Sequence, residues 1–328
     1  MTVEIKNSQF YTLMISRIPA STRKIVALGV LILSAYYIFQ VLISNFEKID
    51  NLGAPLGMME WLALILGSLG TQVLGTVYHF RAVSRLESPA CSDARLGLAY
   101  ALGQIVRYLP GKVFGVMFQI SYLRGNVGGG SVFLALLAQT AYDYSWTVAF
   151  STIVVLSFYL ASLYPLLLLL PIIMSIWMLH SRFIAERLLA RIPLLKEKLE
   201  LRFRHQQQNS AAAAIMTALV LAAWLPLLLG CYVALGSLLG EHLPLILALY
   251  LFSAVVSLAV VVLPSGLVIR EALFAYLGTF FGIDAALLIV VGLYIRIGLT
   301  LSEVLNVLVF GLWTWLDPGN PLDPGASQ

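Results

Sequence analysis

The chain has 328 residues, of which 60% are hydrophobic and only 11% are charged, and its formal net charge is +4. An ordinary soluble domain carries about 25% charged residues, so a secreted enzyme, a disordered protein and a nucleic-acid-binding protein are excluded. The apolar runs are long and continuous, which predicts membrane-spanning helices rather than the alternating strands of a β-barrel. We therefore expect an all-α, polytopic membrane helix bundle with about seven or eight transmembrane helices.

The first residues of the chain are predicted to lie on the membrane surface, ahead of the first span. Residues 1–24 are basic and carry apolar residues at near-helical spacing, which is typical of an interfacial helix. The first two spans are predicted at residues 25–43 and 58–78. No small-residue cleavage site follows the first apolar run, so residues 25–43 are interpreted as a retained anchor.

Residues 96–124 do not fit a span. They contain two apolar stretches of about a dozen residues, each too short to cross roughly 30 Å of hydrocarbon. Pro110 and Gly111 break the helix between these stretches, and Arg107 and Lys112 flank the break. The pattern predicts a re-entrant helical hairpin whose broken backbone is buried in protein or faces a water-filled cavity.

Further spans and a basic surface segment follow the first hairpin. Spans are predicted at residues 132–156 and 163–179, and residues 180–208 are predicted to form an amphipathic helix on the cytoplasmic membrane surface. The remaining segments are spans at residues 211–239, 243–262 and 285–315, a second broken stretch at 263–281 and a short tail at 316–328.

The second broken stretch contains Pro264 and Gly266, and Arg270 and Glu271 follow them. Two interpretations stay open. A re-entrant hairpin leaves the C-terminus outside the cell, whereas a full span returns it to the cytoplasm. The two Leu-Pro breaks lie about 154 residues apart with similar flanking spans, which indicates a faint internal repeat.

The distribution of basic residues predicts the orientation. Residues 1–24, 81–95 and 180–205 hold four, three and seven of the 20 Lys and Arg residues. The positive-inside rule places these three segments, and with them the N-terminus, in the cytoplasm. Residues 25–315 are expected to form a single transmembrane domain.

Charges inside a bilayer are costly, so the charged residues of the hairpins and spans are functional candidates. The cations are Arg107, Lys112, Arg270 and Arg296, and the acids are Asp143, Glu271 and Glu303. Cations beside a helix break favour an anion, because the freed N–H groups and the helix N-termini attract it too. We expect the four cations to bind an anionic lipid headgroup and the three acids to support them. A purely structural role, in which the charges pin the hairpins or Arg296 pairs with Glu303, stays open.

No catalytic or cofactor signature accompanies these charges. Ser265 lies in a Pro-Ser-Gly sequence without a base at suitable depth. The two cysteines and four histidines are scattered, so neither a metal site nor a cofactor is expected. The sequence thus favours a protein that is not an enzyme.

Three blocks of residues carry a family resemblance. They are Arg107-Tyr108-Leu109-Pro110-Gly111-Lys112-Val113-Phe114-Gly115, Leu263-Pro264-Ser265-Gly266-Leu267-Val268-Ile269-Arg270-Glu271-Ala272 and Tyr294-Ile295-Arg296-Ile297. In order and spacing, about residues 20–315 resemble the flippase-like transmembrane domain of lysylphosphatidylglycerol synthases. They resemble in particular the standalone bacterial inner-membrane proteins that lack the synthase domain.

The resemblance implies a multi-pass protein of the bacterial inner membrane. Its expected function is to translocate or bind an anionic phospholipid or a polyprenyl-phosphate-linked lipid. Two alternatives stay open. One is an accessory protein for an envelope lipid synthase or glycosyltransferase, which would dock at residues 180–208. The other is a membrane-embedded enzyme that modifies lipids.

Overall fold

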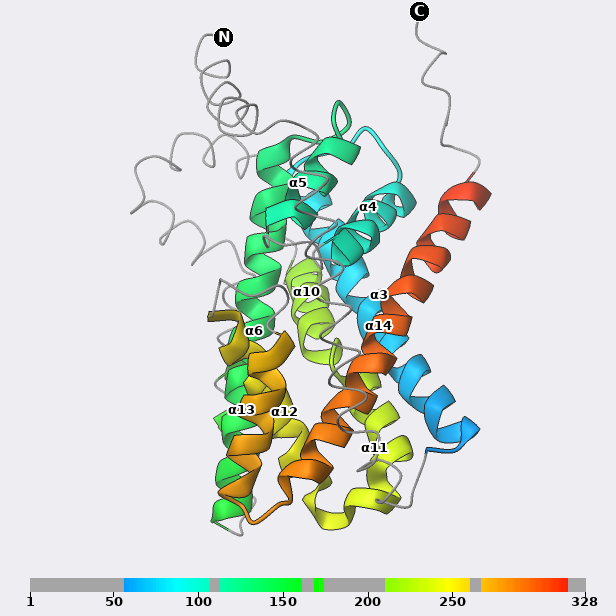
Figure 1. Ribbon diagram of the computed structural model, residues 1–328. Helices are drawn as coiled ribbons and strands as arrows, with labels where there is room; N and C mark the ends of the chain where they lie inside the picture. The colour runs from blue at the N-terminus through cyan, green and yellow to red at the C-terminus, as the bar shows by residue number, and fades with distance from the viewer. Residues whose placement is uncertain are drawn as a thin grey trace, which may run out of the picture.

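In the computed structural model of the protein, residues 56–106, 113–160, 168–170, 172–173, 210–259 and 267–317 are described. The regular structure in these ranges is helical throughout and forms one elongated bundle (Figure 1). The helices in chain order are α3 (Met58–Leu86), α4 (Asp93–Val106), α5 (Val113–Tyr122), α6 (Gly129–Tyr159), α10 (Ser210–Ala222), α11 (Leu225–Leu239), α12 (Leu243–Ala259), α13 (Leu267–Thr279) and α14 (Ala285–Leu316), with a 3₁₀ turn η2 (Gly240–His242) before α12. The all-α class is confirmed for these ranges.

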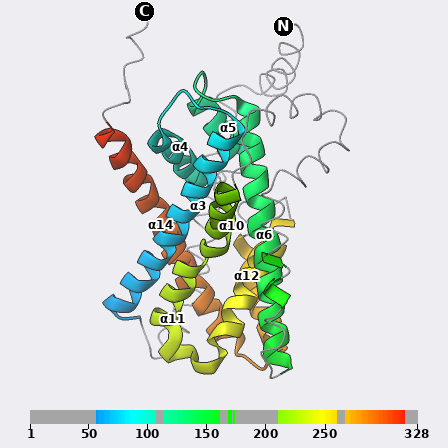
Figure 2. The same ribbon diagram turned by 180° about the vertical axis from the view of Figure 1, so that it is seen from behind.

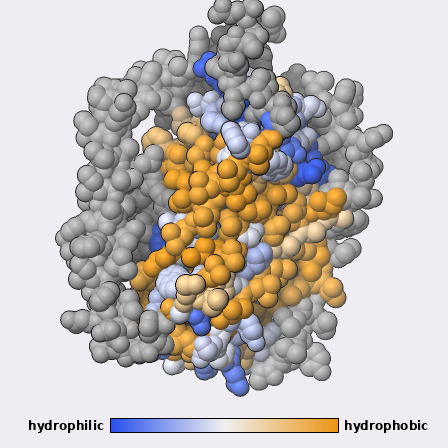
Figure 3. Space-filling model, turned by 90° about the vertical axis from the view of Figure 1, so that its right-hand side faces the viewer, coloured by the Kyte–Doolittle hydropathy of each residue, from blue (hydrophilic) through white to orange (hydrophobic). Residues whose placement is uncertain are grey.

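Three stretches of the described chain are long and apolar enough to cross a membrane: Met58–Leu86, Ala214–Ser257 and Leu287–Leu316. The second combines α10, α11 and α12. Large apolar side chains such as Leu229 and Leu312, each at least 60% exposed, cover the outside of the bundle. On the face seen in Figure 3, hydrophobic residues cover a broad central area, and hydrophilic residues are more frequent near its upper and lower ends. This surface is compatible with a membrane protein, since a soluble monomer rarely exposes such a patch.

The first hairpin is present as two short helices. The helix α4 has 14 residues and α5 has 10, which correspond to about 21 and 15 Å, and the two pack against each other. They lie at one end of the bundle, at the top of Figure 1. The break between them, with Arg107, Pro110, Gly111 and Lys112, lies outside the described residues.

The second hairpin is formed by α12 and α13, which pack side by side. The helix α12 has 17 residues, or about 26 Å, and α13 has 13. The helix α12 occupies most of the span predicted at residues 243–262 and lies almost entirely within the apolar stretch Ala214–Ser257. The turn that joins α13 to α14 lies at the end of the bundle opposite α4 and α5, as Figures 1 and 2 both show. Residues 260–266, with Pro264 and Gly266, lie outside the described residues.

The single span predicted at residues 211–239 is interrupted at residues 223–224, where α10 ends and α11 begins. Pro226 lies in the first turn of α11 and has no N–H to donate, so it cannot continue the hydrogen bonding of α10. The next N–H, that of Leu227, donates to Thr71 Oγ1 of α3 at 3.1 Å. A hydrogen bond therefore joins the α10–α11 junction to α3.

The helices α3 and α11 approach closely because both carry glycine at the crossing. A Cβ atom on Gly67 would lie 2.8 Å from Gly230 Cα, and one on Gly230 would lie 2.6 Å from Ala63 O. Both distances are shorter than side chains tolerate. Small residues of this kind let two backbones pack tightly where water cannot drive association.

The helix α6 contains the span predicted at residues 132–156 and runs along most of the bundle (Figure 1). Its N-terminus is held by Glu87, whose carboxylate accepts hydrogen bonds from Gly128 N at 3.0 Å and Ser131 Oγ at 2.7 Å. A carboxylate at this end also interacts favourably with the helix dipole. Although it has 31 residues, α6 is not among the three apolar stretches, because polar residues such as Gln139 and Asp143 lower its hydropathy.

Other predicted elements fall wholly or mostly outside the described residues. They are the segments at residues 1–24, 25–43, 163–179, 180–208 and 316–328.

Replacing Gly230 by Val should destabilise the protein, because the new side chain collides with the α3 backbone. An overpacked core position costs about 1–3 kcal/mol, so the thermal unfolding midpoint in detergent should fall. Gly236→Val is the matched control, since a Cβ at Gly236 of the same helix meets nothing within 4 Å. Equal midpoints for the two variants would show that the crossing is not tightly packed.

Candidate functional site

A cavity of about 430 Å³ lies inside the bundle. Its wall includes the late residues of α4 and α12 and the early residues of α5 and α13, such as Gln104, Ser257, Gly115 and Arg270. Each hairpin therefore faces the cavity with the ends of its arms that adjoin the break. The helices α3, α6 and α14 and the α10–α11 junction complete the wall. The volume falls within the roughly 300–1,000 Å³ typical of small-molecule sites.

One side of the cavity carries a bridge of three charged residues. Glu271 Oε1 accepts hydrogen bonds from Arg270 Nη2 at 2.8 Å and Nε at 3.1 Å, and from Arg296 Nη1 at 2.7 Å. These side chains are only 14–16% exposed. Because Arg270 and Glu271 lie on α13 and Arg296 on α14, one carboxylate oxygen joins the two helices and holds both guanidinium groups at the cavity wall.

An aromatic residue of α12, Tyr250, also contacts this bridge. The guanidinium of Arg270 lies 5.0 Å from the ring centroid of Tyr250, within the range of a cation–π interaction. Tyr250 in turn packs edge-on against Phe274 of α13, with the ring centroids 5.5 Å apart. Arg270 is therefore held by its ion pair with Glu271 and by its cation–π contact with Tyr250.

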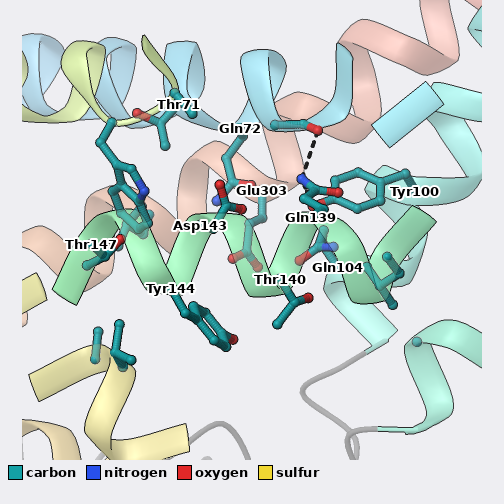
Figure 4. A pocket seen from close by; sticks show the side chains of 18 of the residues that line it. Thr71, Gln72, Tyr100, Gln104, Gln139, Thr140, Asp143, Tyr144, Thr147 and Glu303 are labelled. Atoms are coloured by element: carbon teal, nitrogen blue, oxygen red, sulfur yellow. Dashed lines mark hydrogen bonds between the residues drawn. The ribbon is translucent and has the colours of Figure 1, made fainter. Parts of the chain in front are cut away.

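Two further acids, Asp143 of α6 and Glu303 of α14, reach the cavity from other walls. Figure 4 shows their side chains extending into it, together with that of Gln72 from α3. Within the described part of the chain, the Asp143 carboxylate forms neither a hydrogen bond nor an ion pair. It presents an acceptor to the cavity itself.

Gln139 links three helices at the edge of the cavity. Its Nε2 donates to Gly75 O of α3 and to Tyr100 Oη of α4, both at 3.0 Å, and its Oε1 lies 3.2 Å from His79 Nδ1. The ring of His79 stacks on that of Tyr100, with the centroids 4.4 Å apart. Gln139 thus forms interhelical hydrogen bonds on the same face of α6 as Asp143.

The structure brings together the predicted site residues that it describes. Asp143, Arg270, Arg296 and Glu303 line the cavity, and Glu271 bonds to both arginines. Arg296 and Glu303 share a face of α14 as predicted, and Arg296 pairs with Glu271 of α13. The remaining predicted residues, Arg107, Pro110, Gly111, Lys112, Pro264 and Gly266, lie outside the described residues.

Neutral polar residues of the cavity were missed from the sequence. Gln104, Gln119, Thr147 and Trp224 line it, but single amides, hydroxyls and indoles are ordinary in apolar helices. One signal was available: Gln139, Asp143 and Thr147 follow each other at intervals of four residues and so share one face of α6.

No protein-family model, curated protein or solved structure matches the chain. The family resemblance in the sequence therefore stays a prediction. Among the described residues, His, Cys, Asp and Glu do not gather in groups of three that would suit a metal ion.

Glu271→Gln should destabilise the protein, because it leaves two buried guanidinium groups without their shared carboxylate. Removing one partner of a buried ion pair costs about 3 kcal/mol, which should lower the thermal unfolding midpoint in detergent. Glu241→Gln, in the exposed turn η2, is the control and should leave the midpoint unchanged. If Glu271→Gln is as stable as the wild type, the bridge does not hold α13 to α14.

Proposed function

We propose that this protein is a multi-pass protein of the bacterial inner membrane, with a cytoplasmic N-terminus, that binds a lipid with an anionic headgroup and translocates it across the bilayer. The lipid is a phospholipid or a polyprenyl-phosphate-linked lipid. The observation that carries the proposal is the pair Arg270 and Arg296, held by Glu271 at the wall of an internal cavity in a bundle with an apolar exterior.

A lipid phosphate suits this pair of arginines. A guanidinium has five N–H donors in a planar fork that matches phosphate oxygens, and Glu271 engages only some of them. Hydrogen bonds between charged groups are roughly twice as strong as neutral ones, and water-poor surroundings strengthen them further. Hydrogen bonds from the two guanidinium groups can therefore replace those that the phosphate loses when it leaves water.

The hairpins add a second attraction for an anion. Arg270 lies in the first turn of α13, and Gly115 in the first turn of α5 also lines the cavity. The N-terminal ends of both helices therefore lie beside the cavity, and each carries a partial positive charge with N–H groups that have no partner in the helix. Broken helices that present such ends to the substrate are a recurring feature of transporters.

The two hairpins come from opposite ends of the bundle (Figure 1), which suits movement between leaflets. The end with α4 and α5 carries Arg81, Arg95 and Arg124, whereas the opposite end carries Glu241 and Asp284. By the positive-inside rule the α4–α5 end faces the cytoplasm. A headgroup in the cavity then lies between the two hairpins, one of which enters from each leaflet.

Translocation is tested in proteoliposomes that contain fluorescent phosphatidylglycerol, by quenching the label in the outer leaflet. Wild type should move inner-leaflet label outward, and Arg270→Gln should slow this about tenfold or more, because a hydrogen bond between charged groups is worth about 1.5–3 kcal/mol. Arg124→Gln removes an exposed arginine and should exchange lipid at the wild-type rate.

Arg270→Lys is the control for a folding defect in Arg270→Gln, because lysine keeps the positive charge but lacks the planar fork of N–H donors. It should retain the unfolding midpoint of the wild type and exchange lipid at an intermediate rate. Equal exchange by wild type and Arg270→Gln, with both proteins folded, would contradict the proposed binding site.

A further inference from the structure

The cavity carries more acids than arginines among the residues that the structure describes. Arg270 and Arg296 lie on one side with Glu271 between them. Asp143 and Glu303 extend into the same space from α6 and α14 (Figure 4). When all three acids are ionised, these five groups carry two positive and three negative charges. A lipid phosphate adds another negative charge, so its binding favours the state in which one acid is neutralised.

Asp143 is the acid that is best placed to take up a proton. It lies near the middle of the 31-residue helix α6 and is partly exposed at the cavity wall. Within the described residues its carboxylate has no hydrogen bond or ion pair, whereas Glu271 is held by two arginines and Glu303 is only 2% exposed. An ionised carboxylate without a partner is costly inside a bilayer, and acids in such places serve as proton sites in pumps and transporters.

Asp143 has titratable neighbours, but none of those described forms an ion pair with it. On the helices that pack against α6 or complete the cavity wall, these neighbours are Tyr78, His79 and Arg85 of α3, Tyr100 of α4, Tyr122 of α5, Tyr142 and Tyr144 of α6, Tyr250 of α12, Arg270 and Glu271 of α13, and Arg296 and Glu303 of α14. The helix α10 has no titratable side chain. Arginines stay charged and tyrosines stay neutral near pH 7, which leaves the acids and His79 to exchange protons. Because His79 is only 1% exposed and bonds to Gln139, Asp143 is the group open to the cavity.

We propose that the protein couples lipid translocation to protons, with Asp143 as the proton-binding site. The carboxylate takes a proton from water on the side to which the cavity is open, forming an O–H bond on one of its oxygens, and returns it to water on the other side. The anionic headgroup and the proton cross together, so their charges cancel and the lipid moves toward the side of higher pH. This inference rests on the proposed lipid-binding function and adds its source of energy.

Proton uptake on lipid binding tests the coupling directly, because linkage requires each ligand to strengthen the binding of the other. Phosphatidylglycerol is titrated into purified protein in detergent, and the heat of binding is compared in buffers with different ionisation enthalpies. Wild type should take up as much as one proton per lipid. Its affinity should fall about tenfold as the pH rises, because at an effective dielectric constant of about 20 two like charges about 10 Å apart repel by roughly that factor.

Asp143→Asn separates the proton site from a structural role. The amide resembles the protonated carboxyl group in shape and carries no charge, so lipid binding should take up no proton and should be tighter than in wild type at high pH. The lipid-free variant should be as stable as wild type or more so, since no unpaired charge is left inside the bundle. Asp143→Glu keeps the ionisable group and should retain the pH dependence. Asp284→Asn is the matched control, because Asp284 is exposed and does not line the cavity.

Coupled transport is measured in proteoliposomes that contain fluorescent phosphatidylglycerol, with a pH difference across the membrane and the membrane potential clamped at zero. With wild type, the lipid should accumulate in the leaflet on the alkaline side, up to about tenfold for a difference of about one pH unit if one proton crosses per lipid. The direction does not depend on how the protein is oriented in the vesicle. Protein-free liposomes give the background, and Asp143→Asn should not accumulate lipid above it.

The outcomes distinguish the two proposals. Lipid binding and exchange that depend neither on pH nor on the gradient would overturn proton coupling and leave the proposed function standing. Proton coupling would also be overturned if the lipid followed a sodium gradient at equal pH. The assignment to Asp143 would be overturned if the pH dependence persisted in Asp143→Asn and was lost in Glu303→Gln, or if Asp143→Asn lowered the unfolding midpoint. Failure of every anionic lipid to bind at any pH would overturn the proposed function and this inference with it.

Discussion

The single carboxylate oxygen of Glu271 determines the arrangement of the cavity, because both arginines donate to it. Two buried guanidinium groups repel each other and lose hydration, and either alone would be costly inside a bilayer. Glu271 offsets much of this cost and joins α13 to α14. The two guanidinium groups therefore stay at the cavity wall with a carboxylate between them.

The contrast between the cavity and the exterior explains the unusual composition of α6. The three long apolar stretches also line the cavity, with residues such as Gln72, Trp224 and Arg296, but they are mostly apolar elsewhere. The helix α6 lines it with Gln139, Asp143 and Thr147, which lie four residues apart. These polar residues lower the hydropathy of α6 where it borders the cavity.

Much of the arrangement could be predicted from the sequence because it depends on local chemistry. Pro110 and Gly111 between two short apolar stretches indicated the pair α4 and α5, and buried charges indicated the residues that now line one cavity. Other features depend on partners distant in the chain. Hydropathy does not show which helices pack together, such as α12 on α13. Likewise, the hydrogen bond from Leu227 N to Thr71 of α3 and the contact of Gln119 with Gly103 join residues far apart in the chain, so the sequence pattern does not show them.

The two hairpins contribute different chemistry to the cavity in the parts that are described. The second supplies Arg270 and its partner Glu271, whereas the first supplies the neutral groups of Gln104 and Gln119. Charge acts over a distance and draws in any anion, but hydrogen bonds to neutral groups require a close geometric match. In the described residues, the charged groups and these neutral amides therefore come from separate hairpins at opposite ends of the bundle. A change in the first hairpin can then alter the neutral groups of the wall while the bridge that holds α13 to α14 stays intact.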